Sequence, residues 1–211
     1  MISALNALRR LREGNSRFVE NQSCATATLS PARRAALLEG QEPFAIVLGC
    51  SDSRVPAELV FDQGLGDLFV IRVAGNIVAP SQVGSVEFAA TRFGPRLVVV
   101  MGHSQCGAVM ATLEEVLGRG TTQSRNLRSI VDRVRPSVET VIAGRGEDDP
   151  DAIMRDAVRA NVRASTSHLR HGSELLEALV RNEGLLIVGA EYSLETGVVT
   201  FFEGVPKAGY P

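Results

Sequence analysis

Four short, nearly continuous apolar segments constrain the fold of this chain more than any other feature of its sequence. Each is rich in Val, Ile and Leu, and none alternates polar and apolar residues as a half-exposed strand does. Such segments are typical of strands buried on both faces of a parallel sheet. Stretches with helical spacing separate them, which predicts a single-domain α/β fold with a mostly parallel sheet flanked by helices. The four segments are 44–49, 68–73, 97–101 and 185–189.

A fifth strand is predicted at 198–202, and its short connection to the preceding strand favours antiparallel pairing between the two. A long helix is expected from residue 150 to about 170, with Asp149 as its N-cap and Pro150 in its first turn. The two N-terminal helices have no evident apolar partner nearby in the sequence, so we expect them to pack on a second subunit. The remaining predicted helices are 2–20, 31–39, 81–93 and 107–117.

The length and charge of the chain narrow the classes of function. A chain of 211 residues is below the size at which cores usually divide, and we expect an N-terminal helical arm over 1–40 and one α/β domain over 41–211. The formal net charge of -2 gives no electrostatic indication of nucleic-acid binding. No apolar run approaches the ~18 residues needed to span a membrane, and the N-terminus lacks the order of a secretory signal, which predicts a cytoplasmic protein.

The chain has three cysteines, Cys24, Cys50 and Cys106. An odd, sparse set is not typical of a disulfide framework, and in a reducing compartment it favours metal binding or catalysis. Nothing chemically active surrounds Cys24 in the sequence, so we interpret it as a small buried residue or a plain loop position.

Two chemically unusual segments each follow a predicted strand. Cys50 comes directly after the first strand, and the His103-x-x-Cys106 pair comes directly after the third. In doubly wound sheets, sites form beyond the carboxyl ends of the strands where the strand order reverses. Two thiolates and one imidazole suit zinc and leave a fourth position for water, whereas thiolates disfavour magnesium. The sequence therefore predicts a zinc site, provided that the first and third strands are neighbours.

A carboxylate and a guanidinium lie close to the first cysteine, at Asp52 and Arg54. Asp52 can accept a hydrogen bond from water at the open position of the metal, or it can itself bind the metal as a fourth ligand. Arg54 can hold the carboxylate in a bidentate pair and keep it off the metal. An incidental surface pair is the simpler alternative, with little effect on stability.

The two segments together resemble the β-class carbonic anhydrase family. The resemblance rests on C-x-D-x-R followed, 53 residues after the cysteine, by H-x-x-C, within VLGCSDSRVPAE and VVVMGHSQCGAV. It extends over about 40–110 and more loosely to about 202. It implies a sheet of order 2-1-3-4 with an antiparallel fifth strand. It also implies a homodimer or a higher multiple of dimers, such as a homotetramer, in which the N-terminal helices embrace the partner.

The resemblance also implies roles for individual residues. Cys50, His103 and Cys106 would hold one zinc ion per chain, and Asp52 with Arg54 would form the catalytic dyad. The implied reaction is the reversible hydration of CO₂ to bicarbonate and a proton, in which zinc-bound hydroxide attacks CO₂ and Asp52 orients it.

Four more positions align with the substrate pocket of the family. Gln41 aligns with a glutamine that in many members helps bind bicarbonate from the dimer interface. Phe69, Ala74 and Phe88 align with small or apolar residues that line the pocket. The alternatives are a solvated loop position for Gln41 and ordinary core packing for the phenylalanines.

One departure from the family concerns regulation. Members with a bicarbonate-inhibited regulatory site carry a Trp three positions before the first zinc cysteine. Here that position is Val47 and the chain has no Trp, although Arg72 and Tyr192 align with the other members of that site. We therefore expect an enzyme without this inhibition.

Several alternatives remain open at this stage. The same scaffold could hydrolyse COS or CS₂, linear molecules that resemble CO₂. The zinc could be purely structural with Asp52 as its fourth ligand. A nucleotide-binding module ranks last, because no glycine-rich phosphate motif follows the first strand. His168 and His171 have a suitable ordinary pKa for moving the proton, but we interpret them as lying at a solvated helix end.

Overall fold

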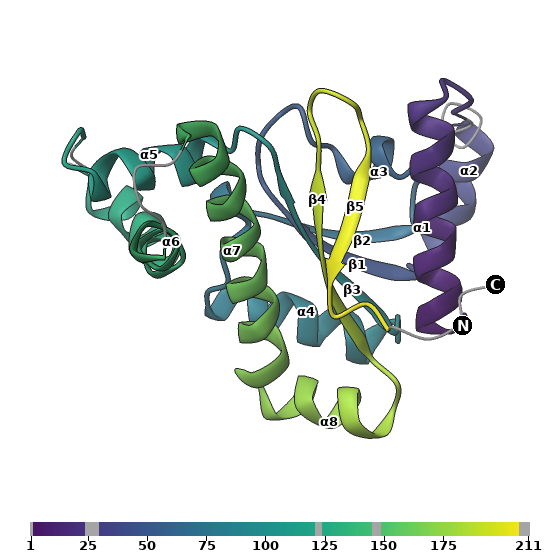
Figure 1. The fold of residues 1–211 in the computed structure, drawn as a ribbon. Coiled ribbons are helices and arrows are strands. Elements are labelled where there is room, and N and C mark those ends of the chain that lie inside the picture. Colours follow the sequence, from purple (N-terminus) through teal and green to yellow (C-terminus); the bar gives the residue numbers. More distant parts are fainter. Residues whose placement is uncertain (1, 24–29, 121–123, 145–148, 207–211) are drawn as a thin grey trace.

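A twisted five-stranded sheet forms the centre of the computed structural model, and helices lie against both of its faces (Figure 1). Residues 2–23, 30–120, 124–144 and 149–206 are described. The strands are β1 (Ala45–Gly49), β2 (Leu68–Arg72), β3 (Leu97–His103), β4 (Leu186–Tyr192) and β5 (Val199–Glu203). They lie in the order β2-β1-β3-β4-β5, with the first four parallel and β5 antiparallel to β4. The expected order and the antiparallel fifth strand are confirmed.

The helices are α1 (Ala4–Val19), α2 (Pro31–Ala36), α3 (Ala57–Val60), α4 (Pro80–Arg92), α5 (Gly107–Val116), α6 (Arg125–Ala143), α7 (Pro150–His171) and α8 (Glu174–Asn182). All the predicted helices are present, although the one expected over 31–39 continues from α2 as a short 3₁₀ turn. The N-cap predicted for α7 is confirmed, since the Asp149 side chain accepts a hydrogen bond of 3.1 Å from the Asp151 N–H. Cys24 lies outside the described residues.

Helices α6 and α8 were not predicted from the sequence, although both begin at a capping serine. The Ser124 hydroxyl accepts a hydrogen bond from the Leu127 N–H, and the Ser173 hydroxyl accepts one from the Leu176 N–H. This is the N-cap pattern of helices. Helix α6 also contains Pro136, a residue that argues against a helix interior. Both helices also bury apolar residues at helical spacing, so the serine caps and the apolar periodicity were both usable signals.

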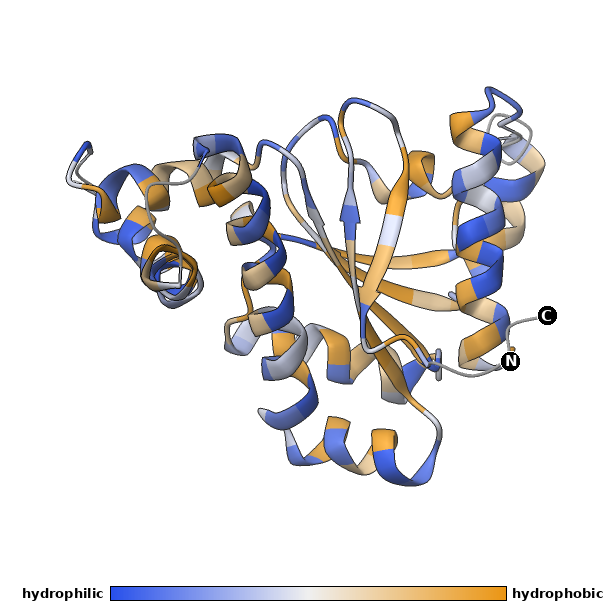
Figure 2. Cartoon of the chain, viewed as in Figure 1, coloured by the Kyte–Doolittle hydropathy of each residue, from blue (hydrophilic) through white to orange (hydrophobic). Residues whose placement is uncertain are grey.

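Alternate residues of the strands point into two separate hydrophobic clusters, one on each face of the sheet. On one face, α4, α7 and α8 cover residues that include Ile46, Val98 and Ile187. On the other, α1 and α3 cover residues that include Val47 and Val99. Figure 2 shows the apolar strands inside and the polar sides of the helices outside. Burial of both faces explains why the strands are nearly continuous apolar runs.

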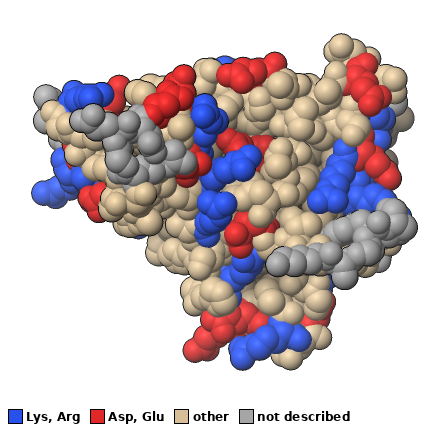
Figure 3. All heavy atoms as spheres, viewed as in Figure 1, with Lys and Arg blue, Asp and Glu red and all other residues tan. Residues whose placement is uncertain are grey.

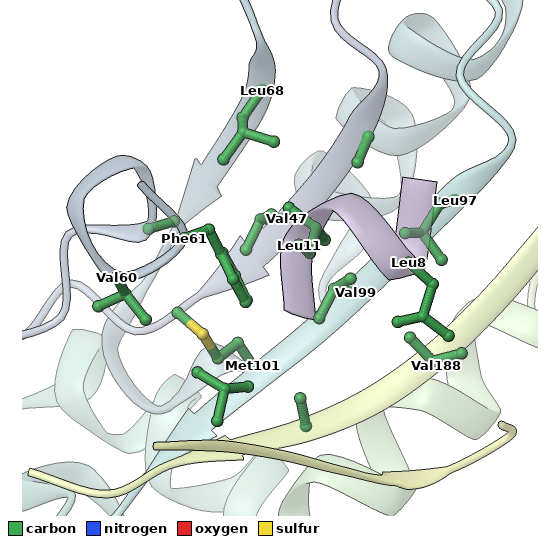
Figure 4. Close-up of a cluster of buried hydrophobic side chains, with 14 of the residues drawn as sticks. Leu8, Leu11, Val47, Val60, Phe61, Leu68, Leu97, Val99, Met101 and Val188 are labelled. Atoms are coloured by element: carbon green, nitrogen blue, oxygen red, sulfur yellow. The ribbon is translucent and has the colours of Figure 1, made fainter. Parts of the chain in front are cut away.

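Helix α1 packs on apolar residues of its own chain that are distant in the sequence, a contact that was not predicted from the sequence. Leu8 and Leu11 are fully buried and lie over the sheet beside Val99 and Val188 (Figure 4). Because these partners are distant in the sequence, periodicity could not reveal them. Packing of the exposed side of α1, which includes Leu5, on a second subunit stays a prediction. Helix α2 buries none of its residues.

A third cluster lies beyond the carboxyl ends of β1 and β3. It joins α5, α6 and α7 and includes Cys50, Cys106, Val134 and Val158. Helical packing therefore encloses the edge of the sheet at which the sequence predicts a metal site.

The surface mixes both signs of charge. Figure 3 shows acidic and basic side chains interspersed over the face that it presents. Across the described ranges, no helix combines the length and apolar character that crossing a bilayer requires.

Asn15 fastens α1 to two other parts of the fold. Its amide nitrogen donates hydrogen bonds to the carbonyl oxygens of Val60, at 3.1 Å, and Gly197, at 2.8 Å. Its amide oxygen accepts a hydrogen bond of 2.8 Å from the Val199 N–H. The side chain is 6% exposed, so water cannot readily replace these bonds. The helix is thereby tied to α3 and to the β4–β5 hairpin.

We expect Asn15→Ala to lower the free energy of unfolding by about 2–4 kcal/mol, because it leaves buried backbone groups without partners. Urea unfolding followed by circular dichroism measures this loss. Asn6→Ala, on an exposed position of the same helix, is the matched control and should change stability by less than about 1 kcal/mol. Equal effects of the two substitutions would contradict the anchoring role of Asn15.

Candidate metal centre

Two loops at the same edge of the sheet bring Cys50, His103 and Cys106 together. Cys50 follows the last residue of β1, and His103 is the last residue of the neighbouring β3. Cys106 is the N-cap of α5, one short turn further on. One ligand atom of each residue lies within 4.8 Å of the others, and all three residues are buried. The structure therefore unites the three residues that the sequence predicts as metal ligands.

The orientation of His103 fits a metal ligand. Its Nδ1 lies 2.9 Å from the carbonyl oxygen of Ser104. A carbonyl oxygen can only accept a hydrogen bond, so Nδ1 carries the hydrogen and Nε2 keeps its lone pair. Nε2 is one of two buried side-chain nitrogen or oxygen atoms without a hydrogen-bond partner among the described residues. A buried lone pair beside two thiols fits a bound metal, with Nδ1–H fixed by the backbone as in other metal sites.

The two thiols titrate as a pair. The hydrogen bond from Cys106 lowers the pKa of Cys50 to about 4, with further help from His103 and nearby backbone N–H groups and against the effect of burial. The same contact with Cys50, together with burial, raises the pKa of Cys106. Without metal the pair therefore shares one proton at neutral pH, since two adjacent buried thiolates repel each other.

Asp52 and Arg54 form the bidentate pair that the sequence predicts. Arg54 donates from Nε to Asp52 Oδ1 at 2.9 Å and from its terminal nitrogen to Oδ2 at 2.8 Å. The Arg54 backbone N–H also donates to Oδ1 at 2.9 Å, a local turn that the two-residue spacing allows. These hydrogen bonds hold the pKa of Asp52 well below its ordinary value. Oδ2 lies 4.0 Å from His103 Nε2, so the carboxylate stands beside the three candidate ligands.

Arg72 braces the loop that carries Cys50 and Asp52. It is the last residue of β2 and pairs in register with Gly49 of β1. Its guanidinium donates to the carbonyl oxygens of Cys50, at 3.0 Å, and Asp52, at 2.6 Å. Sequence reasoning considered Arg72 only as part of a regulatory site, so this role was missed. A lone charge at the end of an apolar strand was the available signal.

The four positions predicted to bind substrate divide into two groups. Ala74 follows β2 at the metal edge, and the N–H of the next residue, Gly75, donates to Cys50 Sγ at 3.4 Å. Gln41 instead precedes β1, so the length of that strand, about 16 Å, separates it from Cys50.

Phe69 and Phe88 lie away from the metal edge as well. Phe69 pairs with Ile46, near the beginning of β1. The two rings lie 6.3 Å apart and both contact Phe93. Phe88 is 54% exposed. Within one chain, the structure does not bring Gln41, Phe69 or Phe88 to the three candidate ligands.

The two candidate proton carriers, His168 and His171, lie in the last turn of α7 and are exposed. They occupy a solvated helix end, as the sequence indicates.

The chain is similar to known proteins over most of its length. A family model described as "Carbonic anhydrase" matches residues 45–199. Carbonic anhydrase 2 of Mycobacterium tuberculosis (strain CDC 1551 / Oshkosh) is 38% identical over 203 residues, which cover 96% of this chain and 95% of that protein.

Solved structures show the same fold. The β-carbonic anhydrase CafA of Aspergillus fumigatus has a TM-score of 0.74 at 24% identity and covers 95% of this chain and 91% of its own. One of two tetrameric β-carbonic anhydrases from Sordaria macrospora has a TM-score of 0.71 at 23% identity, covering 93% and 96%. At this identity the structural matches support the fold alone.

The shared proton predicts how the metal-free site responds to Zn²⁺. Because the pKa of Cys50 is lowered to about 4 and that of Cys106 is raised, binding at pH 7 should release about one thiol proton per zinc. The apparent affinity should then rise about tenfold per pH unit. Two ordinary thiols would release two protons and give a slope of two.

Isothermal titration calorimetry in buffers of different ionisation enthalpy measures the released protons. Cys106→Ala removes the thiol that holds the proton, and it should bind zinc weakly. Release of two protons by the parent protein would contradict the shared-proton arrangement.

Proposed function

This chain belongs to the β-class carbonic anhydrase family, and we propose that it hydrates CO₂ reversibly to bicarbonate and a proton at one zinc ion held by Cys50, His103 and Cys106. The observation that carries this proposal is the convergence of three buried ligand atoms within 4.8 Å, one of them the unpartnered Nε2 of His103. This donor set suits zinc and leaves its fourth position open.

The residues around the ligands supply the protein's part of the chemistry. Zinc bound there supplies a Lewis acid that makes water a nucleophile near neutral pH. Asp52, ionised because its pKa is held low by Arg54, accepts a hydrogen bond from the attacking water and so orients it. Arg54 keeps the carboxylate in that orientation through its bidentate pair of hydrogen bonds. Ala74, next to the Gly75 that contacts Cys50, carries a side chain small enough to admit a molecule such as CO₂ in this proposal.

A closed state is the alternative role of Asp52. Its Oδ2 is already 4.0 Å from His103 Nε2, so a small movement away from Arg54 would let it become a fourth ligand. The pairing with Arg54 in this structure supports the open arrangement as the active one.

A second copy of the chain completes the substrate pocket in this proposal. Gln41, Phe69 and Phe88 are remote from the ligands of their own chain, and Phe88 exposes more than half of its surface. They would face the metal site of a partner, in a homodimer or a multiple of dimers. The structurally similar enzymes from Sordaria macrospora are tetrameric.

Four finer expectations stay predictions. They are the division into an arm over 1–40 and a domain over 41–211, the cytoplasmic location, a preference for CO₂ over COS or CS₂, and the absence of the Trp-dependent regulatory site.

Val47, at the position of that Trp, is fully buried in the same cluster as Tyr192. Arg72 uses its guanidinium to hold the Cys50–Asp52 loop.

The catalytic dyad is tested by stopped-flow CO₂ hydration on protein of known zinc content. We expect rapid turnover by the parent and a loss in kcat of roughly 10²-fold for Asp52→Asn, because the amide misorients the attacking water. Arg54→Gln should lower kcat by a similar factor, since it frees Asp52. Asp132→Asn, on an exposed position of α6, is the control and should leave kcat unchanged.

Zinc content should stay near one per chain in all three variants. Unchanged kcat in Asp52→Asn would contradict the dyad. A zinc-loaded parent that turns over COS but not CO₂ would replace the proposed activity with the hydrolase.

The shared pocket is tested by mixing two variants that each lack a different part of the site. Cys106→Ala should lose the metal, and Gln41→Ala should lose a contact to bicarbonate and at least tenfold in kcat/KM. In a mixed dimer, the metal site of the Gln41→Ala chain would receive Gln41 from the Cys106→Ala chain. We therefore expect dissociation and reassociation of the two variants to restore up to half of the parent activity per metal-bearing chain. No restoration in verified mixed dimers would contradict a shared pocket.

A further inference from the structure

We propose that helix α7 positions the metal site: Asn161 and Ser165 hold the turn at Gly75 and Asn76, and this turn holds the sulfur of Cys50. The inference rests on the proposed function, in which Cys50 is a zinc ligand. Nothing in the spacing of the motifs points to α7, which begins more than forty residues after Cys106.

Two buried hydrogen bonds connect α7 to the turn. Asn161 Nδ2 donates to the Gly75 carbonyl oxygen at 2.7 Å, and Ser165 Oγ donates to the Asn76 carbonyl oxygen at 3.0 Å. Asn161 is 2% exposed and Ser165 is 5% exposed. They are four residues apart, so they lie one above the other on the same face of the helix. Helix α7 as a whole packs against β3 and β4 (Figure 1).

The turn contacts Cys50 directly. The Gly75 N–H donates to Cys50 Sγ at 3.4 Å. The same turn also touches the helix that carries Cys106, because a Cβ added to Gly75 would lie 3.1 Å from the Ala108 Cβ. The turn thus contacts Cys50 on one side and the first turn of α5, directly after Cys106, on the other. A shift in it would change the hydrogen bond to one sulfur and the packing beside the other.

The turn needs outside support to keep this conformation. Gly75 and Asn76 both have positive φ angles, 69° and 42°. Glycine adopts this region without strain, and asparagine tolerates it better than most other residues. Both residues can adopt other conformations as well, so local preference alone does not fix the turn. The two carbonyl oxygens are held instead by side chains of α7, which water could not replace at such burial.

Helix α7 also contacts the strand residue that precedes His103. A Cβ added to Gly102 would lie 2.6 Å from Val162 of α7. One helix thus supports both loops, through hydrogen bonds on the Cys50 side and through close packing on the His103 side.

A hydrogen bond to a ligand sulfur stabilises the thiolate and fixes its direction. Loss of such an outer contact typically costs 10–100-fold in metal affinity. Asn161 and Ser165 are accordingly positioning residues that act through Gly75 and Asn76. The rival explanation is that they only satisfy buried carbonyl groups and contribute to stability alone.

The experiment compares Asn161→Ala and Ser165→Ala with Thr166→Val. Thr166 is fully buried in the same helix, and its hydroxyl donates only to Val162, within α7, at 2.7 Å. Thr166→Val therefore removes a buried hydrogen bond of α7 without touching the turn. Ser165→Thr retains the hydroxyl and serves as the conservative variant. Circular dichroism and urea unfolding establish that each variant folds and how much stability it loses.

Two measurements on the full-length holoprotein decide between the explanations. The first is the rate at which bound zinc passes to an excess of chelator. The second is the energy of the thiolate-to-metal charge-transfer band after replacement of zinc by Co²⁺, which reports on hydrogen bonding to the sulfur. We expect 10–100-fold faster zinc release and a shifted band in Asn161→Ala and Ser165→Ala. Thr166→Val and Ser165→Thr should match the parent in both.

Zinc release and band energy like those of Thr166→Val would overturn the inference. Faster release with an unshifted band would overturn it as well, because that pattern indicates general loosening. A parent protein that takes up neither zinc nor cobalt would overturn the proposed function, and this inference with it. A parent that binds one zinc, with variants that behave like Thr166→Val, would overturn only the role of α7.

Discussion

Parallel pairing of β1 with β3 is the constraint on which the metal site depends. The chain leaves β1 toward β2 on one side and returns as β3 on the other, so the order of the strands reverses at β1. At such a point the connections leave a crevice beyond the carboxyl ends of the strands. The register sets Gly49 opposite Met101, so Cys50 and His103 come out at nearly the same level. A slip of this register would separate the thiol from the imidazole.

Burial of so many polar groups is tolerable only because nearly every one has a partner. The backbone serves His103 through the Ser104 carbonyl and Cys50 through the Gly75 N–H. Arg72 donates hydrogen bonds to the carbonyl oxygens of Cys50 and Asp52, and Arg54 pairs with the Asp52 carboxylate. Arg54 thereby favours the charged form of Asp52, while the contacts of Cys50 with Cys106 and His103 favour its thiolate. The lone pair of His103 Nε2 has no hydrogen-bond partner among the described residues, and a metal ion would satisfy it.

Much of this could be predicted from the sequence, for identifiable reasons. The strands could be predicted because burial on both faces requires continuous apolar runs. Cys50, His103 and Cys106 could be predicted as a set because thiolates and imidazole are typical zinc ligands. The strand order came from family resemblance, because periodicity does not encode neighbours. Polar residues such as Asn161 could not be predicted as part of the site. In the sequence, a buried asparagine of an amphipathic helix looks like any solvated one, and only its tertiary contact with Gly75 distinguishes them.

The placement of Gln41 and Phe88 separates the metal site, which one chain forms, from the proposed substrate pocket, which needs two chains. The candidate metal ligands come from a single chain and are enclosed by its own helices α5, α6 and α7. Retention of a metal would therefore be a property of the single folded chain. The proposed wall of the substrate pocket lies at the far end of the sheet and requires a second copy. Dilution would then reduce turnover before it affects metal content. An arrangement of this kind allows an exposed apolar residue such as Phe88 to serve association and substrate binding at once.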